Sequence, residues 1–502
     1  MGSQSPITPA EIAVMGPEDF ADFVQSFGSG AIENRQTPEG LARALREAVK
    51  IDPLSWASGL AQHVMRLRHP TYVSAIVEGL RSALSETGHL PLPWDEVIDG
   101  LAQVVDEPWP VEPLAPSDWD YETSWRNAGD SVSRLLRESL DGNQPLGLQV
   151  PRIYELLLKQ MRKTDEPSGV GVGSVEDIRD GLMSAVNKPS TVALEGLYSL
   201  FLFAHRHDLR GDWGDRFYQA LDEELDHSTE ENLLASHVMA PRVAQYVALY
   251  EPGRQQIRRL LGDPTGLSLR VGVIETLLTF GRPQNPPFLG MIRPYLFAYL
   301  NPDFSRDEQG VRRAAQWLVI GYLWGAEGFD LDILMSTLQY GRALSLAAEA
   351  YGRILSAEEG QSTPDDEHKA LAFWDAALAA ADDSAQLHGF GWWSEGSLPD
   401  GDWLERMLDT LQRTDGRIDW DHAVAERLAS LPPGDASLMC LRLMVKGATD
   451  YWALRYWSDH IRRSLEASRS DPALDSGRRD LVEALLEREF LEFRDFLPTS
   501  DG

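Results

Sequence analysis

Cysteine is almost absent from this sequence of 502 residues. The one cysteine, Cys440, excludes an internal disulfide and any structural zinc site built from several cysteines. It lies in the apolar run Leu438-Met439-Cys440-Leu441, which predicts a buried and unreactive thiol. Long apolar runs are also missing, since no stretch reaches the roughly 18–20 uninterrupted apolar residues of a membrane span.

Basic residues are scarce relative to acidic ones. The chain has 46 Lys and Arg against 78 Asp and Glu, which gives a formal net charge of −32. Such a balance disfavours a non-specific nucleic-acid binder, because phosphate binding needs clustered cations, and it disfavours docking on anionic lipid. We expect a solvated acidic surface, no membrane association and a partner other than nucleic acid.

Motifs of catalysis are missing as well. The sequence contains no Gly-Lys pair, so the Gly-rich stretch Gly169-Val170-Gly171-Val172-Gly173 is better explained as a flexible linker than as a phosphate loop. Neither Gly-x-Ser-x-Gly nor His-Glu-x-x-His occurs. We therefore predict no catalytic residue, no metal and no cofactor, and a chain that is not an enzyme by itself.

The best metal-like cluster is His205-Arg206-His207-Asp208, with His227 nearby. Two imidazoles two residues apart diverge on a helix, and their spacing matches no established zinc site. We expect a buried helix that ends near His205, where polar side chains are common. A metal-dependent hydrolase that uses His205, His207 or His227 remains an alternative.

Helix starts recur along the chain. Thr8-Pro9-Ala10-Glu11 supplies a capping hydroxyl, a proline at the first helical position and a carboxylate three residues after the cap. Thr363-Pro364-Asp365-Asp366 repeats the pattern, Thr37-Pro38-Glu39 repeats its first half, and Gly16-Pro17-Glu18-Asp19 is a weaker version. These are local signals for helices at many points.

Apolar spacing of about 3.6 residues supports these helices. It is seen in Val73, Ile76, Val77, Leu80 and Leu84, in the stretch Trp403 to Leu411, and in a last helix from Leu481 towards Phe490 and Phe493. The stretch Leu267 to Ile274 alternates like a strand, but its continuation fits a helix better. We predict an all-α fold, a degenerate HEAT/armadillo-like α-solenoid of antiparallel helix pairs in a curved array.

The most linker-like segment is Glu166 to Ser174, which has neither helical periodicity nor bulky side chains. We place a boundary there. The predicted parts are an N-terminal helical subdomain, 1–165, and a helical-repeat array, 175–502.

Two regions could anchor a partner. Trp392 and Trp393 lie beside a carboxylate in a Gly-rich stretch, where they could form an aromatic cage or could instead fill the core. In the second region aromatic and arginine side chains lie close in sequence; its members are Trp452, Arg455, Trp457 and Arg462. A competing hypothesis is a nucleic-acid or nucleotide sensor that uses Arg254 and Arg258, although we expect such arginines to pair with carboxylates on neighbouring helices.

Two stretches carry a resemblance: residues 8–27, from Thr8-Pro9-Ala10-Glu11 to Phe27, and the ending Glu487-Arg488-Glu489-Phe490-Leu491-Glu492-Phe493-Arg494-Asp495-Phe496-Leu497. With the helices between them, they resemble the C-terminal helical region of large bacterial STAND-type ATP-binding proteins, many of which are linked to antiphage defence. The chain departs from that family in lacking the Walker loop of its ATPase. The resemblance implies a sensor or scaffold part and carries over no catalytic residue.

These observations together predict a non-catalytic scaffold or sensor module that binds a protein partner. The resemblance makes a phage component or an effector subunit the expected partner in antiphage defence. The N-terminus, Met1-Gly2-Ser3-Gln4-Ser5, has neither the basic nor the apolar region of a signal peptide, so we expect a cytoplasmic protein.

Overall fold

The structure is a computed structural model. It describes residues 4–27, 37–106, 125–142, 144–163, 188–226, 229–265, 269–301, 308–357, 363–449 and 451–497. Every regular element in these ranges is a helix and none is a β-strand, so the predicted all-α class is confirmed. No helix in the described ranges is long and apolar enough to cross a membrane.

The helix starts follow the predicted capping chemistry. At α1 (Pro9–Phe27) the Glu11 carboxylate accepts hydrogen bonds from the backbone N–H and the hydroxyl of Thr8, at 2.7 and 2.8 Å. At α2 (Pro38–Ile51) the Thr37 hydroxyl accepts from the backbone N–H of Gly40, at 3.1 Å. At α20 (Pro364–Ala380) Thr363 and Asp366 form a complete capping box. Local hydrogen bonds therefore fix these boundaries.

The weaker start at Gly16 is also seen. Gly16 has φ 76° and ψ 175°, so the helical backbone of α1 breaks there and resumes at Pro17. A side chain at this left-handed φ would be strained, and glycine avoids that cost.

Apolar spacing identified the helices well and their ends less well. All the apolar residues predicted for one face of α5 (Pro70–Thr87) are buried, and α15 (Val271–Phe280) is a helix rather than a strand. The last α-helix, α25 (Asp475–Glu487), ends before Phe490 and Phe493, towards which the predicted helix runs. Glu489 takes φ 68°, and the chain continues as the 3₁₀ helix η5 (Leu491–Phe496), because the left-handed residue ends the α-helical ladder.

The chain divides into two compact units. Unit 1 comprises Met1–Val243 and Tyr250–Leu260, and unit 2 comprises Ala244–Leu249 and Leu261–Gly502. The boundary predicted at Glu166 to Ser174 lies outside the described residues. The helices on either side of it, α8 (Val150–Arg162) and α10 (Pro189–Arg206), pack together within unit 1.

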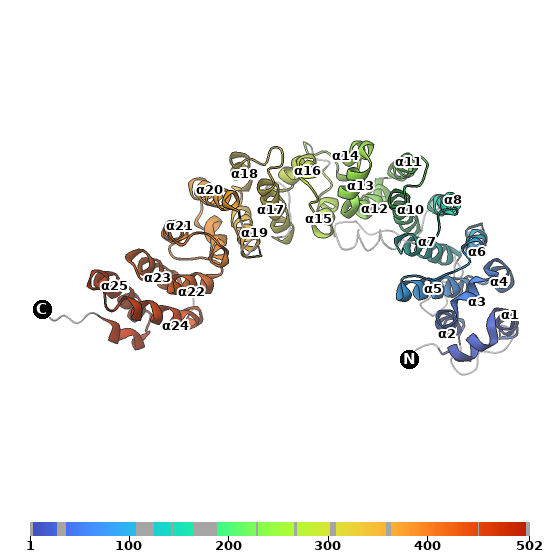
Figure 1. The fold of residues 1–502 in the computed structure, drawn as a ribbon, viewed down its shortest axis with the longest axis horizontal. Helices are drawn as coiled ribbons and strands as arrows, with labels where there is room; N and C mark the ends of the chain where they lie inside the picture. The colour runs from blue at the N-terminus through green and yellow to red at the C-terminus, as the bar shows by residue number, and fades with distance from the viewer. Residues whose placement is uncertain are drawn as a thin grey trace. The chain divides into compact units, whose positions relative to one another are not determined.

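Unit 1 consists of two rows of helices in which each helix packs on the next member of its own row (Figure 1). The first row is α2, α5, α7 (Trp125–Asp141), α10 and α12 (Thr229–Met239), and the second is α1, α4 (Leu60–Leu67), α6 (Trp94–Asp106), α8 and α11 (Trp213–Asp226). The shorter elements of this unit are α3 (Pro53–Ala57), η1 (Ala240–Arg242) and η2 (Glu251–Gln256). The division between the units falls at two further helices, α13 (Val243–Leu249) and α14 (Ile257–Leu261). Packing between helices that alternate in sequence is the arrangement of a helical solenoid.

Unit 2 repeats this arrangement. Its first row is α15, α17 (Glu308–Leu323), α19 (Ala343–Ala357), η3 (Ser384–Glu395), α22 (Asp421–Ser430) and α24 (Tyr451–Ser468). Its second row is α18 (Leu331–Leu338), α20, α21 (Asp400–Arg413), α23 (Asp435–Gly447) and α25. Two further elements pack on these rows: α16 (Pro286–Tyr299) contacts α15 and α17, and η4 (Pro472–Leu474) contacts α25. The chain is an all-α helical-repeat solenoid, as the sequence predicts.

Cys440 is fully buried in α23, as predicted. Burial raises the pKa of its thiol to about 12, so the thiolate needed for nucleophilic chemistry is disfavoured.

Candidate functional site

The Gly-rich stretch around Trp392 forms η3, a 3₁₀ helix that lies against α19 and α22. Its glycines permit this close approach. A Cβ atom at Gly389 would lie 1.9 Å from the carbonyl oxygen of Ser345, and one at Gly391 would lie 1.7 Å from that of Asp419. The sequence therefore places the η3 backbone directly on its neighbours and turns Trp392 and Trp393 to opposite environments.

Trp393 belongs to the core. Its side chain is 0% exposed, its indole Nε1 donates to the carbonyl oxygen of Ala348 at 2.7 Å, and its ring packs near Phe373, Trp374 and Phe390. The expectation of an exposed anchor is wrong for this residue. The alternative, in which an indole of this stretch fills the core, holds for it.

Trp457, also predicted to anchor a partner, is buried as well. It is 2% exposed because it shares the buried face of α24 with Leu454 and Ile461. The spacing of these three residues is helical, so the sequence contained the signal that Trp457 points inward.

Trp392 is half-buried at the start of an aromatic stack. The Arg353 guanidinium lies 4.1 Å from the centroid of its ring, and the Trp420 ring is stacked at 3.9 Å with an angle of 12°. The predicted cage around an open ring is therefore not formed here, because both faces of Trp392 are covered by the chain's own side chains.

Trp420 holds an uncommon backbone conformation. It caps α22 with φ 58°, ψ 34°, a left-handed geometry that costs on the order of 1–3 kcal/mol in a non-glycine residue. Its indole Nε1 donates to the Glu395 carboxylate at 2.8 Å, and its ring contacts His422 at 4.3 Å. The stacking on Trp392 and this hydrogen bond offset the strain and fix the ring at the surface.

The stack continues onto α24. The His422 ring lies 5.9 Å from Tyr456, and Tyr456 is one helical turn from Trp452. Tyr456 is 71% exposed and Trp452 is 77% exposed. We call these residues the aromatic row. Ring contacts join Trp392, Trp420, His422 and Tyr456; Trp452 lies one turn from Tyr456 on α24, and its ring contacts Tyr451.

Trp392 and Trp452 are predicted from the sequence, whereas the other members of the row are not. Tyr456 was available from helical spacing, because it lies one turn after Trp452 on the side opposite Leu454 and Ile461. Trp420 was not available, since its contact with Trp392 joins segments that are distant in sequence.

The predicted arginines are engaged by other side chains. Arg455 is paired with Glu492 at 3.2 Å, and Arg462 lies 5.2 Å from the centroid of the Phe493 ring. On the competing Arg-rich segment, Arg254 lies 3.8 Å from Glu251. Neighbouring Arg259 pairs with Asp222 and Asp226 of α11. Arg455 and Arg259 thus pair with carboxylates of neighbouring elements, as expected, whereas Arg254 pairs within η2 and Arg462 lies over a ring.

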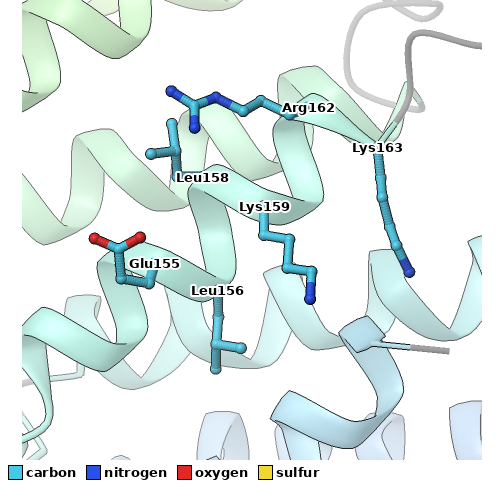
Figure 2. A pocket seen from close by; sticks show the side chains of 6 residues that line it. All are labelled: Glu155, Leu156, Leu158, Lys159, Arg162 and Lys163. Carbon is cyan, nitrogen blue, oxygen red and sulfur yellow. The ribbon is translucent and has the colours of Figure 1, made fainter.

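A hollow of about 450 Å³ lies on α8 in unit 1 (Figure 2). Lys159 and Lys163 extend to one side, where they reach Asp106 and the carbonyl oxygen of Val105 on α6, whereas Arg162 extends away from them. Arg162 forms a bidentate pair with Glu223 of α11, in which Nη2 donates to Oε1 at 2.9 Å and Nε donates to Oε2 at 3.1 Å. These cations hold adjacent helices together, so the hollow does not present a cluster of uncommitted positive charge.

A second hollow of about 520 Å³ in unit 1 lies over α2, α5 and α7. Basic and acidic side chains alternate along it, with Arg81 on Glu78 at 2.9 Å and Arg134 on Asp130 at 3.3 Å. Burial raises the pKa of Asp130 to about 6, although the adjacent Arg134 acts in the opposite direction. The mixed charges leave no strong preference for a ligand of either sign.

The histidine cluster lies at the predicted helix end. α10 ends at Arg206, where His205 and His207 are both exposed, and the His207 ring contacts Phe203 at 4.2 Å. His227 and the stretch Gly169 to Gly173 lie outside the described residues. In the part of the chain that is described, no group of three or more His, Cys, Asp or Glu side chains could hold a metal ion.

Comparisons with known proteins assign no family. No family model and no curated protein matches the sequence. A chain in the solved structure "Crystal structure of APC/C hetero-tetramer Cut9-Hcn1" aligns with 97% of this chain and 87% of its own length, at 12% sequence identity and a TM-score of 0.15. With a TM-score this low, the alignment carries no argument about function.

Proposed function

We propose that this chain is a non-catalytic helical-repeat scaffold that binds a protein partner through the aromatic row of unit 2. The observation that carries the proposal is the exposure of Trp452 and Tyr456, at 77% and 71%, on a surface continuous with the Trp392–Trp420 stack. Contiguous exposed aromatic side chains mark interaction surfaces, and Trp and Tyr dominate the binding energy of protein interfaces.

The charge balance supports a protein over a nucleic acid. A reader of single-stranded nucleic acid combines stacking rings with a positively charged groove. Here the net charge is −32, Arg353 over the Trp392 ring is paired with Glu349, and Arg455 on α24 is paired with Glu492. Aromatic rings beside ion-paired arginines favour a protein surface.

The finer proposal is a sensor or scaffold role in bacterial antiphage defence, in the cytoplasm, with a phage component or an effector subunit as the partner. It rests on the resemblance of residues 8–27 and 487–497 to the helical regions of STAND-type proteins. Comparing phage plating on bacteria that express the chain or its Trp452→Ala/Tyr456→Ala variant tests this role. Equal plating on both strains and on cells without the chain would contradict it.

The binding proposal is tested by capture of proteins from lysates of infected and uninfected bacteria on the immobilised chain. The test variant is Trp452→Ala/Tyr456→Ala. The matched control is Trp324→Ala/Tyr340→Ala, which removes one Trp and one Tyr of unit 2 that are 46% and 45% exposed outside the row. We expect a protein that the wild type and the control retain and the test variant loses.

Retention of the same proteins by all three chains would contradict the proposal. Nucleic acid as the only retained partner, released between low and moderate salt, would establish the competing sensor hypothesis instead.

A further inference from the structure

Beside the aromatic row lies a hollow of about 600 Å³ on unit 2. Its polar lining comes from α19, η3, α21 and α22, and includes Ser356, Ser394, Glu395, Asp400, Glu426 and Ser430. We call it the acidic hollow. From its chemistry we infer that it binds an arginine side chain from a basic segment of the protein partner; this inference rests on the proposed function.

Two carboxylates give the acidic hollow its excess negative charge. Within the described ranges neither Glu395 nor Glu426 forms an ion pair, and the only hydrogen bond found for either is the one that Glu395 accepts from Trp420. Asp400 is different, because it is paired with Arg427 at 3.0 Å. A cationic ligand would therefore meet Glu395 and Glu426.

Both Nη groups of Arg427, the basic residue of the lining, are committed to hydrogen bonds. Its Nη1 donates to the carbonyl oxygens of Trp393, Ser394 and Gly396, at 3.1 to 3.4 Å. Its Nη2 donates to Asp400 and to the carbonyl oxygen of Leu398. The guanidinium thus ties η3 to α22 and leaves the two glutamates uncompensated.

The serine hydroxyls make the acidic hollow rich in acceptors. Ser356 donates to the carbonyl oxygen of Gly352 at 2.9 Å, and Ser430 donates to that of Arg427 at 2.7 Å. Their hydrogens are used within the helices, so their oxygens remain available as acceptors. Ser394 is only 8% exposed, and its hydroxyl has no hydrogen-bond partner among the described residues.

A guanidinium group matches this lining. It presents five N–H donors in one plane and never accepts, and it pairs with carboxylates through charge-assisted hydrogen bonds. Lysine would supply a point charge with fewer donors.

The acidic hollow and the aromatic row share a border. Glu395 lines the hollow and also accepts from the Trp420 indole, and Glu426 is one helical turn from His422 on α22. A partner segment that places an arginine in the hollow would lay its neighbouring residues on the row. The net charge of −32 adds long-range attraction for such a segment.

The test uses the full chain and fluorescence anisotropy of a labelled arginine–glycine repeat peptide, with lysine–glycine and glutamate–glycine peptides as comparisons. The test variant is Glu395→Gln/Glu426→Gln, which keeps an oxygen for the Trp420 indole. The matched control is Glu483→Gln/Glu487→Gln, two exposed glutamates one turn apart on α25. It removes the same charge elsewhere on unit 2.

We expect the test variant to bind the arginine peptide about tenfold or more weakly than the wild type, and the control to bind like the wild type. The lysine peptide should bind more weakly than the arginine peptide. Equal weakening in both variants would mean attraction by net charge alone and would overturn the inference, as would no change in the test variant.

The capture experiment separates this inference from the proposed function when it compares Trp452→Ala/Tyr456→Ala with Glu395→Gln/Glu426→Gln. If Trp452→Ala/Tyr456→Ala loses the partner while Glu395→Gln/Glu426→Gln keeps it, the row binds a partner and the arginine inference falls. If neither variant changes capture, the proposed function falls as well.

Discussion

In each unit a buried glutamate lies between two arginines, and the second arginine of each cluster makes a different further contact. In unit 1, Glu195 of α10 pairs with Arg137 and Arg242, and Arg242 also donates to a backbone carbonyl. In unit 2, Glu349 of α19 pairs with Arg312 and Arg353, and Arg353 continues over the Trp392 ring. The same electrostatic arrangement joins helices in both units. In unit 2 it also orients an exposed aromatic surface.

The largest effect separates the core of unit 2 from its surface. Trp393→Ala should lower the free energy of unfolding by about 3–5 kcal/mol, since a fully buried indole and its hydrogen bond to Ala348 are lost. Trp452→Ala should change it by less than about 0.5 kcal/mol, because that side chain is 77% exposed. Urea denaturation followed by circular dichroism measures both. Equal losses would remove the distinction between the core and the row.

The next effect tests the comparison of the two clusters. Glu195→Ala and Glu349→Ala should each lower the free energy of unfolding by about 2–3 kcal/mol, less than for a fully buried pair because Arg137 and Arg353 reach solvent. Only Glu349→Ala should also weaken partner binding, since it releases Arg353 from its position over Trp392. Denaturation and capture assays on both variants check this. Weaker binding in Glu195→Ala as well would contradict the assigned difference.

Sequence reasoning located the helices of both units because their signals are local. The Thr363–Asp366 capping box and the buried face of α5 depend on residues a few positions apart, and both form as predicted. The end of α25 was not predicted, because glutamate, unlike glycine, does not indicate a left-handed backbone, and Glu489 adopts one.

The candidate site was only partly predictable for the same reason. Adjacent Trp392 and Trp393 are equivalent in the sequence, and only the packing of η3 between α19 and α22 separates them. Trp420 joins the row through a contact between two separate elements. The helical spacing on α24, in contrast, was sufficient to place Trp457 inside and Tyr456 outside.

A smaller effect is expected at Asp130, which lines the second hollow of unit 1. Burial raises the pKa of Asp130 from 3.8 to about 6 in the folded state. The folded state therefore holds this proton more tightly than the unfolded state, and the stability that this contributes is lost as the pH rises through about 6. As the pH rises from about 5 to about 7.5, the free energy of unfolding of Asp130→Asn should therefore increase by about 1–2 kcal/mol relative to that of the wild type. Urea denaturation across this range measures the difference. A constant difference would show that Asp130 does not titrate there.

The smallest effect is expected on the ion pairs that join the second row of unit 1. The side chains of Arg162 and Glu223 are 55% and 43% exposed, so Arg162→Ala should lower the free energy of unfolding by at most about 1 kcal/mol. This loss should be smaller in high salt, because salt screens the ion pair. Denaturation at low and high salt measures both terms. A loss as large as that of Glu195→Ala would contradict the view that these pairs contribute little.

Site-specific photocrosslinking tests the central claim most directly. A photoreactive phenylalanine would replace Tyr456 in the aromatic row, and in a second chain Met65, which is 54% exposed in unit 1. Each chain would be irradiated with the partner captured by the wild type. We predict a covalent adduct from position 456 and none from position 65. An adduct from position 65 alone, or equal adducts from both, would contradict the assignment of binding to the aromatic row.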